Sequence, residues 1–195
     1  KITIGVNQVL KKVSCQYNVR TDLSFLKETL SFLKNNQILF LSEGDKGNLR
    51  CSNKNYIEKN HKKDKRIVLF KHQQNKLSIK ELPGDDEIVV SWSTITSAIH
   101  IAAYMGAKNI ILVGHDCGTL DNELNFSGYH TQKSLTISHK NVEGYKKWVP
   151  RIENQTITLK TLLKQKYHCN VYSLNPFINF GLEGHIYQGL SLIHI

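Results

Sequence analysis

The sequence lacks long apolar runs and paired cysteine motifs. No stretch of its 195 residues approaches the ~18 consecutive apolar residues of a transmembrane helix, so no membrane span is expected. Its four cysteines stand far apart without C-x-x-C spacing, which indicates reduced thiols and no zinc site. These absences favour a cytoplasmic protein without a bound metal or a tightly bound cofactor.

Three well-known motifs are also missing. The chain holds no G-x-x-x-x-G-K-[ST], no G-x-G-x-x-G and no G-x-S-x-G. Their absence argues against a P-loop NTPase, a typical dinucleotide-binding enzyme and an α/β-hydrolase.

Acidic residues are scarce relative to basic ones. The chain has 16 Asp and Glu residues and 26 Lys and Arg residues, which gives a formal net charge of +10. Such a surface favours anions such as nucleotides, phosphates, acidic lipids or nucleic acid, and charge alone does not choose among them. The length and a hydrophobic content of 40% predict a single domain over residues 1–195.

Apolar segments of strand length alternate with helical patterns. Strands are expected at residues 1–6, 16–19, 37–41, 67–71, 87–91, 110–113 and 170–174. Helices are expected at residues 23–33 with Asp22 as N-cap, then at 95–105, at 142–148 ended by Pro150, and at 157–167. Residues 77–80 are expected to form an edge hairpin with 67–71. This alternation predicts an α/β protein with a three-layer Rossmann-like fold, a mainly parallel sheet and helices on both faces.

Two polar segments interrupt the alternation. Residues 43–66 read as a mobile basic insertion that ends in the run Lys59 to Arg66. The run is expected to be a solvated face, and the alternative is a flap that faces a phosphate or an acceptor. Only Tyr56 supplies an aromatic ring, so nucleic acid is disfavoured as a partner. Residues 119–140 have the length of a lid loop.

The central unit, Ser93 to Asp116, carries the polar groups of greatest interest. Ligands bind outside the carboxyl ends of strands in open α/β sheets. Hydroxyl groups cluster where the helix of this unit begins. Such a cluster can bind an anion or a sugar, and the alternative is that these hydroxyls only cap the helix. These candidate binding residues are Ser93, Thr94, Thr96 and Ser97.

The same unit ends in Gly114, His115 and Asp116. A carboxylate beside an imidazole at a strand end suits acid/base chemistry or ligand positioning, and the alternative is a loop cap beside a packed histidine. A metal cluster of His115, Asp116, His130 and His139 matches no standard spacing, so no metal site is predicted.

The order of these segments resembles a Rossmann-like superfamily that contains the MptE-like and Maf-type bacterial proteins and the bacterial CMP-sialic-acid-dependent sialyltransferases. Four pieces carry the resemblance over most of the chain. They are the strand ending in Gly-Val-Asn7-Gln8, the helix led by Asp22, the unit from Ser93 to Asp116, and the helix and strand from Thr158 to Pro176.

The resemblance implies roles for individual residues. Asn7, beside Gln8, would contact the nucleotide, and the Ser/Thr turn would meet the donor's phosphate and sugar. Tyr129 would steady the leaving phosphate, while a second family tyrosine, expected near Gly118, is absent. The family's catalytic histidine has no counterpart at residues 150–154, so His139 or His130 would replace it. Asp116 would position a ribose, sugar or base.

The family's opening strand and its Gly-rich loop have no counterpart here. Either the chain is truncated before residue 1 or it has lost that half of the nucleotide site, and truncation is favoured because residue 1 falls at the start of a strand.

Three functions compete at this stage. The first is a glycosyltransferase-like protein, related to sialyltransferases, that uses a nucleotide-activated sugar of the CMP type and a glycan acceptor. The second is an MptE-like pterin diphosphokinase that uses ATP and Mg²⁺, with carboxylates from Asp116, Asp121 and Glu123. The third is a non-enzymatic basic module that binds nucleic acid or other anions. The inner face of the membrane and a homo-oligomer are both compatible with these functions.

Overall fold

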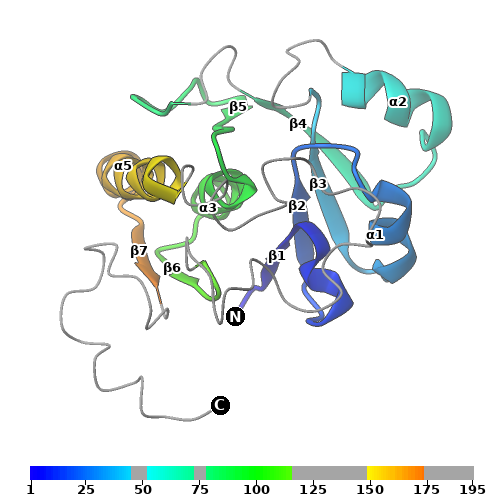
Figure 1. The fold of residues 1–195 in the computed structure, drawn as a ribbon, viewed down its shortest axis with the longest axis horizontal. Coiled ribbons are helices and arrows are strands. Elements are labelled where there is room, and N and C mark those ends of the chain that lie inside the picture. Colours follow the sequence, from blue (N-terminus) through cyan, green and yellow to red (C-terminus); the bar gives the residue numbers. More distant parts are fainter. Residues whose placement is uncertain (45–51, 73–77, 116–148, 174–195) are drawn as a thin grey trace. The chain divides into compact units, whose positions relative to one another are not determined.

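The computed structural model describes residues 1–44, 52–72, 78–115 and 149–173 (Figure 1). The chain divides into two compact units, Lys1–Ala102 and Ala103–Ile195. Each unit is described by itself, and a single domain over residues 1–195 stays a prediction. No helix within the described ranges has both the length and the apolar character needed to cross a bilayer.

The first unit contains a five-stranded sheet in which every neighbouring pair is parallel. Its strands follow one another in sequence order: β1 (Ile4–Val6), β2 (Tyr17–Arg20), β3 (Ile38–Ser42), β4 (Ile67–His72) and β5 (Glu87–Ile88). The helices of this unit are η1 (Asn7–Lys11), α1 (Leu26–Phe32), α2 (Ser52–Asn60) and α3 (Thr94–Tyr104). The predicted α/β Rossmann-like fold with a parallel sheet is confirmed.

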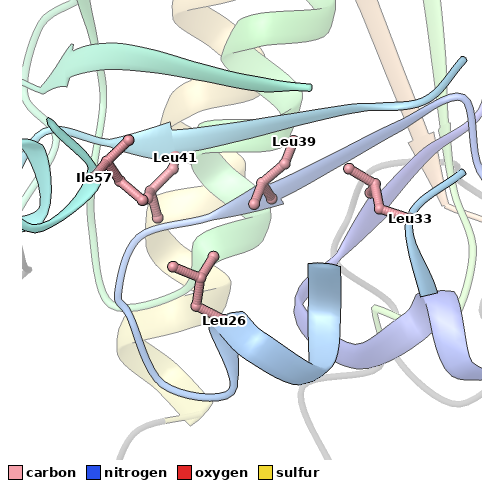
Figure 2. Packing of buried hydrophobic residues seen from close by; sticks show 5 residues of the cluster. All are labelled: Leu26, Leu33, Leu39, Leu41 and Ile57. Carbon is pink, nitrogen blue, oxygen red and sulfur yellow. The ribbon is translucent and has the colours of Figure 1, made fainter. Parts of the chain in front are cut away.

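One face of the sheet is covered by η1, α1 and α2. Leu39 and Leu41 of β3 are fully buried against Leu26 of α1 and Ile57 of α2, as Figure 2 shows. Leu10 of η1 packs against the same cluster. Burying side chains of this size stabilises the fold by about 1.5–3 kcal/mol each, so this cluster fixes the helices on their strands.

The other face is covered by α3. Ala98 and Ile101 of α3 form a buried cluster with Val19 of β2, and Ile4 and Val6 of β1 pack against it. The helix therefore covers this face of the sheet together with side chains of its strands. Helices lie on both faces, as the sequence predicts.

Segment 43–66 contains a helix that its sequence pattern does not predict, while its mobility stays a prediction. Where the structure describes it, residues 52–60 form α2, the crossover between β3 and β4. The sequence pattern hides this helix because Ile57 is its one buried apolar side chain and Asn53 is its buried polar one. The basic run thus begins in the last turn of a helix.

Two smaller predictions in the first unit are wrong. Asp22 does not cap α1, which begins at Leu26 after Phe25 in the left-handed conformation. Instead, Asp22 Oδ1 accepts the Ser24 N–H at 2.8 Å in a local turn. Ser78–Lys80 form no strand, and β4 pairs with β5 in parallel.

β5 ends at Ile88 rather than at Ser91 because side chains of α3 take over the next backbone groups. His100 Nδ1 accepts the Val89 N–H at 3.1 Å, and Ser97 Oγ donates to the Val89 carbonyl at 2.8 Å. Val89 is fully buried, so both of its backbone groups need partners. The side chains of α3 satisfy them in place of a neighbouring strand.

The second unit contains the parallel pair β6 (Asn109–Leu112) and β7 (Asn170–Ser173), with helix α5 (Val149–Tyr167) before β7. Gly106 ends α3 with φ of +90°, as its position predicts. Pro150 lies in the first turn of α5, where a proline gives up no helical hydrogen bond.

The continuous apolar run at residues 110–113 is typical of a strand covered on both faces, but the structure differs. Ile111 is 58% exposed and Val113 is 78% exposed, whereas Leu112 is buried. Among the described residues of this unit, the buried side of the pair is the one that carries Leu112 and Val171.

Candidate functional site at the carboxyl edge of the sheet

In a parallel sheet all strands end on the same side. We call this side of the five-stranded sheet the carboxyl edge. It comprises the residues that end or directly follow the strands, namely Asn7, Gln8, Thr21, Asp22, Ser42, His72 and residues 89–97. The predicted binding residues of the first unit belong to this set, as the strand-end rule requires.

Asn7 stands where β1 passes into η1. Its φ is +54°, a left-handed conformation that asparagine tolerates better than most residues. Gly5 allows the tight passage, since a Cβ there would lie 2.5 Å from Val9 Cγ1. The backbone thus holds Asn7 at the end of the first strand, and Gln8 beside it is buried.

Two buried amide oxygens lie in this corner. Asn18 of β2 is fully buried, and its Nδ2 donates to the Asn7 carbonyl at 3.2 Å. Within the part of the chain that the structure describes, Asn7 Oδ1 and Asn18 Oδ1 receive no hydrogen bond. A buried acceptor without a donor costs about 1–3 kcal/mol, so both oxygens suit an N–H or O–H donor from a ligand or a water molecule.

The ends of β2 and β3 are tied together through α2. Asn53 Nδ2 donates to the Thr21 carbonyl at 3.3 Å and to the Ser42 carbonyl at 2.9 Å. The Thr21 hydroxyl lies 3.1 Å from the Thr94 hydroxyl at the start of α3. All four residues are buried, so helices from both faces fix the middle of the carboxyl edge.

The ends of β3 and β4 are joined by a serine and a histidine. Ser42 Oγ lies 2.5 Å from His72 Nδ1, and the same hydroxyl donates to the Gly44 carbonyl at 2.7 Å. A hydroxyl has one proton, so when it donates to Gly44 the bond to His72 requires a proton on Nδ1. This arrangement holds the imidazole in position and does not activate Ser42 as a nucleophile.

Arg20 is buried at the end of β2, with 2% of its surface exposed. Its guanidinium donates to Thr29 Oγ1 of α1 at 3.0 Å and to the Ser24 carbonyl, and it lies 3.4 Å from Asp22 Oδ1. These contacts bind the loop after β2 to α1 and make Arg20 a structural residue of the edge.

The hydroxyls at the start of α3 are engaged within the chain. Ser93 Oγ accepts the Ile95 N–H at 3.4 Å, so Ser93 caps the start of α3, as the alternative to ligand binding expects. Thr96 Oγ1 donates to the Ser93 carbonyl at 2.7 Å, and Ser97 is bonded to Val89. Thr96 and Ser97 are fully buried, while Ser93 is half-buried. A ligand at this turn would therefore meet Ser93 more readily than the other hydroxyls.

The remaining predicted site residues belong to the second unit. Gly114 is exposed with φ of +70°, and His115 follows it half-buried. His115 Nε2 lies 3.0 Å from Thr156 Oγ1 of α5, and burial lowers the pKa of His115 to about 4. The imidazole is therefore neutral at pH 7. Asp116, Tyr129, His130 and His139 lie outside the described residues, as do the predicted lid at 119–140 and the helix at 142–148.

Metal and thiol chemistry finds little support in the described ranges. They hold no group of three or more His, Cys, Asp and Glu side chains placed to bind a metal ion. Cys15 and Cys169 are free and buried, and burial raises the pKa of both thiols. Both thiols therefore stay protonated at neutral pH and are poor nucleophiles.

Several residues in or beside this edge are not predicted from the sequence, chiefly Asn18, Arg20, Asn53 and His72. The sequence holds a signal for two of them. Asn18 and Arg20 flank Val19 in a strand, so their side chains lie on the face of the sheet opposite to that of Val19. Nothing in the local pattern distinguishes Asn53 from the exposed Asn55 and Asn60 of the same helix.

Comparisons of this chain with models of protein families, with curated protein sequences and with solved structures found no match.

Proposed function

We propose that this chain binds a nucleotide-activated sugar at the carboxyl edge of its five-stranded sheet and acts as a glycosyltransferase-like protein related to the sialyltransferases. The proposal combines the sequence resemblance with the position of Asn7. The CMP type of nucleotide and a glycan acceptor follow from the resemblance alone.

The observation that carries the proposal is that the connections between strands change from one face of the five-stranded sheet to the other. The connections after β1, β2 and β3 pack on one face of the sheet, and α3 after β5 packs on the other. Right-handed crossovers on opposite faces carry the chain in opposite directions across a sheet. Ile4 and Val6 of β1 pack against the same buried cluster as Ala98 and Ile101 of α3, so β1 contributes to the face on which α3 packs.

Ligands of doubly wound sheets bind where the direction reverses, at the carboxyl ends of the strands. Asn7 follows β1 at the carboxyl edge, and its buried Oδ1 receives no hydrogen bond from the described chain. An exocyclic amine or a ribose hydroxyl of a nucleotide is a suitable donor to such an oxygen, after a small rotation of the side chain that exposes it.

Calorimetric titration with CMP, CDP and UDP tests this binding. We expect a measurable affinity that falls by about fivefold in Asn7→Gly, since one lost hydrogen bond is worth about 1 kcal/mol. Glycine accepts a φ of +54°, so this variant removes the side chain without straining the backbone.

Asn55→Ala, which changes an exposed asparagine of α2, is the matched control. No nucleotide binding at millimolar concentration, or equal affinities of the two variants, would contradict the proposal. Binding of ATP only with Mg²⁺ would favour the diphosphokinase instead.

Four residues are proposed to carry the transfer step. His139, with His130 as the alternative, would accept the proton of the acceptor hydroxyl. Tyr129 would stabilise the leaving phosphate, and Asp116 would position the donor. His139→Gln should then abolish transfer to an acceptor while leaving nucleotide affinity unchanged, and retained transfer in both His139→Gln and His130→Gln would remove these roles.

A further inference from the structure

The side of the sheet opposite the carboxyl edge is strongly basic. We call this side the amino edge. It comprises the residues that directly precede β2, β3 and β4, namely Gln16, residues 33–37 and residues 61–66. Because the strands are parallel, the run Lys59 to Arg66 enters β4 on this side, away from the carboxyl edge. It therefore does not serve as a flap over the strand ends.

Two turns of the amino edge lie side by side. Arg66 Nη1 donates to the Leu33 carbonyl at 2.7 Å, which joins the turn before β4 to the turn before β3. Exposed lysines from both turns therefore share one surface. We call this surface the basic patch, and its lysines are Lys34, Lys62, Lys63 and Lys65.

Little negative charge offsets the basic patch. Asp64 is the one acidic residue between His61 and Arg66, and its carboxylate is held by Arg66 at 2.7 Å. The neighbouring Arg66 keeps the pKa of Asp64 below its usual range. Arg66 and Asp64 thus neutralise each other, and the lysines set the charge that a partner meets.

An exposed aromatic side chain borders the patch. Phe32, the last residue of α1, is 45% exposed and lies two residues before Lys34. An exposed apolar ring next to a lysine-rich segment is typical of surfaces that rest on anionic lipid, where the ring enters the headgroup region.

We infer that the basic patch docks the chain on an anionic lipid surface. A nucleic acid fits the patch less well, because its arginine is already bonded to Asp64 and Leu33. The patch offers lysines only, which act as point charges, whereas arginine forks recognise phosphates and bases in a directed way. This inference does not depend on the proposed function, because it concerns the opposite edge and its test measures no catalysis.

Vesicle flotation of the full chain tests the inference. We expect the chain to float with vesicles of phosphatidylcholine and phosphatidylserine at low salt and not with phosphatidylcholine alone. The triple variant Lys62→Gln, Lys63→Gln and Lys65→Gln should lower the partition coefficient by about a hundredfold, since each lysine near such a surface is worth about fivefold.

The matched control removes the same charge elsewhere. Lys27, Lys80 and Lys108 are exposed, and their triple change to glutamine should cost less than about fivefold. Phe32→Ala should lower partitioning by about fivefold with the charge unchanged, because part of a buried ring is lost. Equal losses in the two triple variants, or no flotation of the wild type, would overturn the inference. So would a preference for an RNA oligonucleotide over vesicles at the same salt.

Discussion

The two edges of the five-stranded sheet use polar side chains in opposite ways. At the carboxyl edge they are buried and bonded to one another, as Asn53 is to the ends of β2 and β3. At the amino edge four of the six charged side chains are exposed lysines, and the bonded pair of Asp64 and Arg66 holds the turns in place. The bonded side chains of the first edge therefore stabilise the fold, while the exposed lysines of the second add charge with little effect on stability.

The largest expected effect concerns Arg20. Arg20→Ala removes buried hydrogen bonds to Thr29 and Ser24 and leaves their acceptors unsatisfied. We expect a loss of about 3 kcal/mol in the free energy of unfolding, measured with urea. Lys27→Ala, an exposed change on α1, should stay within about 0.5 kcal/mol. A loss from Arg20→Ala no larger than that of the control would mean that the carboxyl edge is not held as described.

The next effect separates two asparagines of one helix. Asn53→Ala should cost about 2 kcal/mol of unfolding free energy, because two buried carbonyls, those of Thr21 and Ser42, lose their donor. Asn55→Ala, two residues further along α2 and exposed, should cost less than about 0.5 kcal/mol. Equal costs would show that Asn53 does not join the strand ends.

The smallest effect belongs to the amino edge and depends on pH. Asp64 has a lowered pKa because Arg66 donates to its carboxylate, so the pair adds stability above the unfolded pKa of about 3.9. This stability is lost as pH falls through the lowered folded pKa. Asp64→Asn should cost up to about 1 kcal/mol at pH 7, and the difference from wild type should vanish in acid. A constant difference across the pH range would rule out the charge as its cause.

Much of this fold could be predicted because burial leaves a regular pattern. The segment Gln37 to Leu41 reads as a strand and forms most of β3, and Gly106 marks the end of α3 because the left-handed conformation favours glycine. Boundaries were less predictable. Glu87 to Ser91 reads as one strand, but Val89 bonds to side chains of α3, a tertiary effect that no local pattern reveals.

The candidate site could be predicted in its location and only in part in its members. The strand-end rule places Asn7 and Thr94 at the carboxyl edge because it depends on chain direction alone. It does not say which hydroxyls stay available, and Thr96 and Ser97 turn out to be bonded inside the chain. Helix α2 was missed since a short helix with one buried apolar residue has almost no periodicity.

Chemical shifts of backbone amides during a titration with CMP test the central claim most directly, because they report on both edges at once. The account predicts that the resonances of Asn7, Thr21 and Thr94 move with a common saturation curve while those of Asn36 and Asp64 stay in place. Shifts gathered at Asn36 and Asp64, or none anywhere at millimolar CMP, would contradict it.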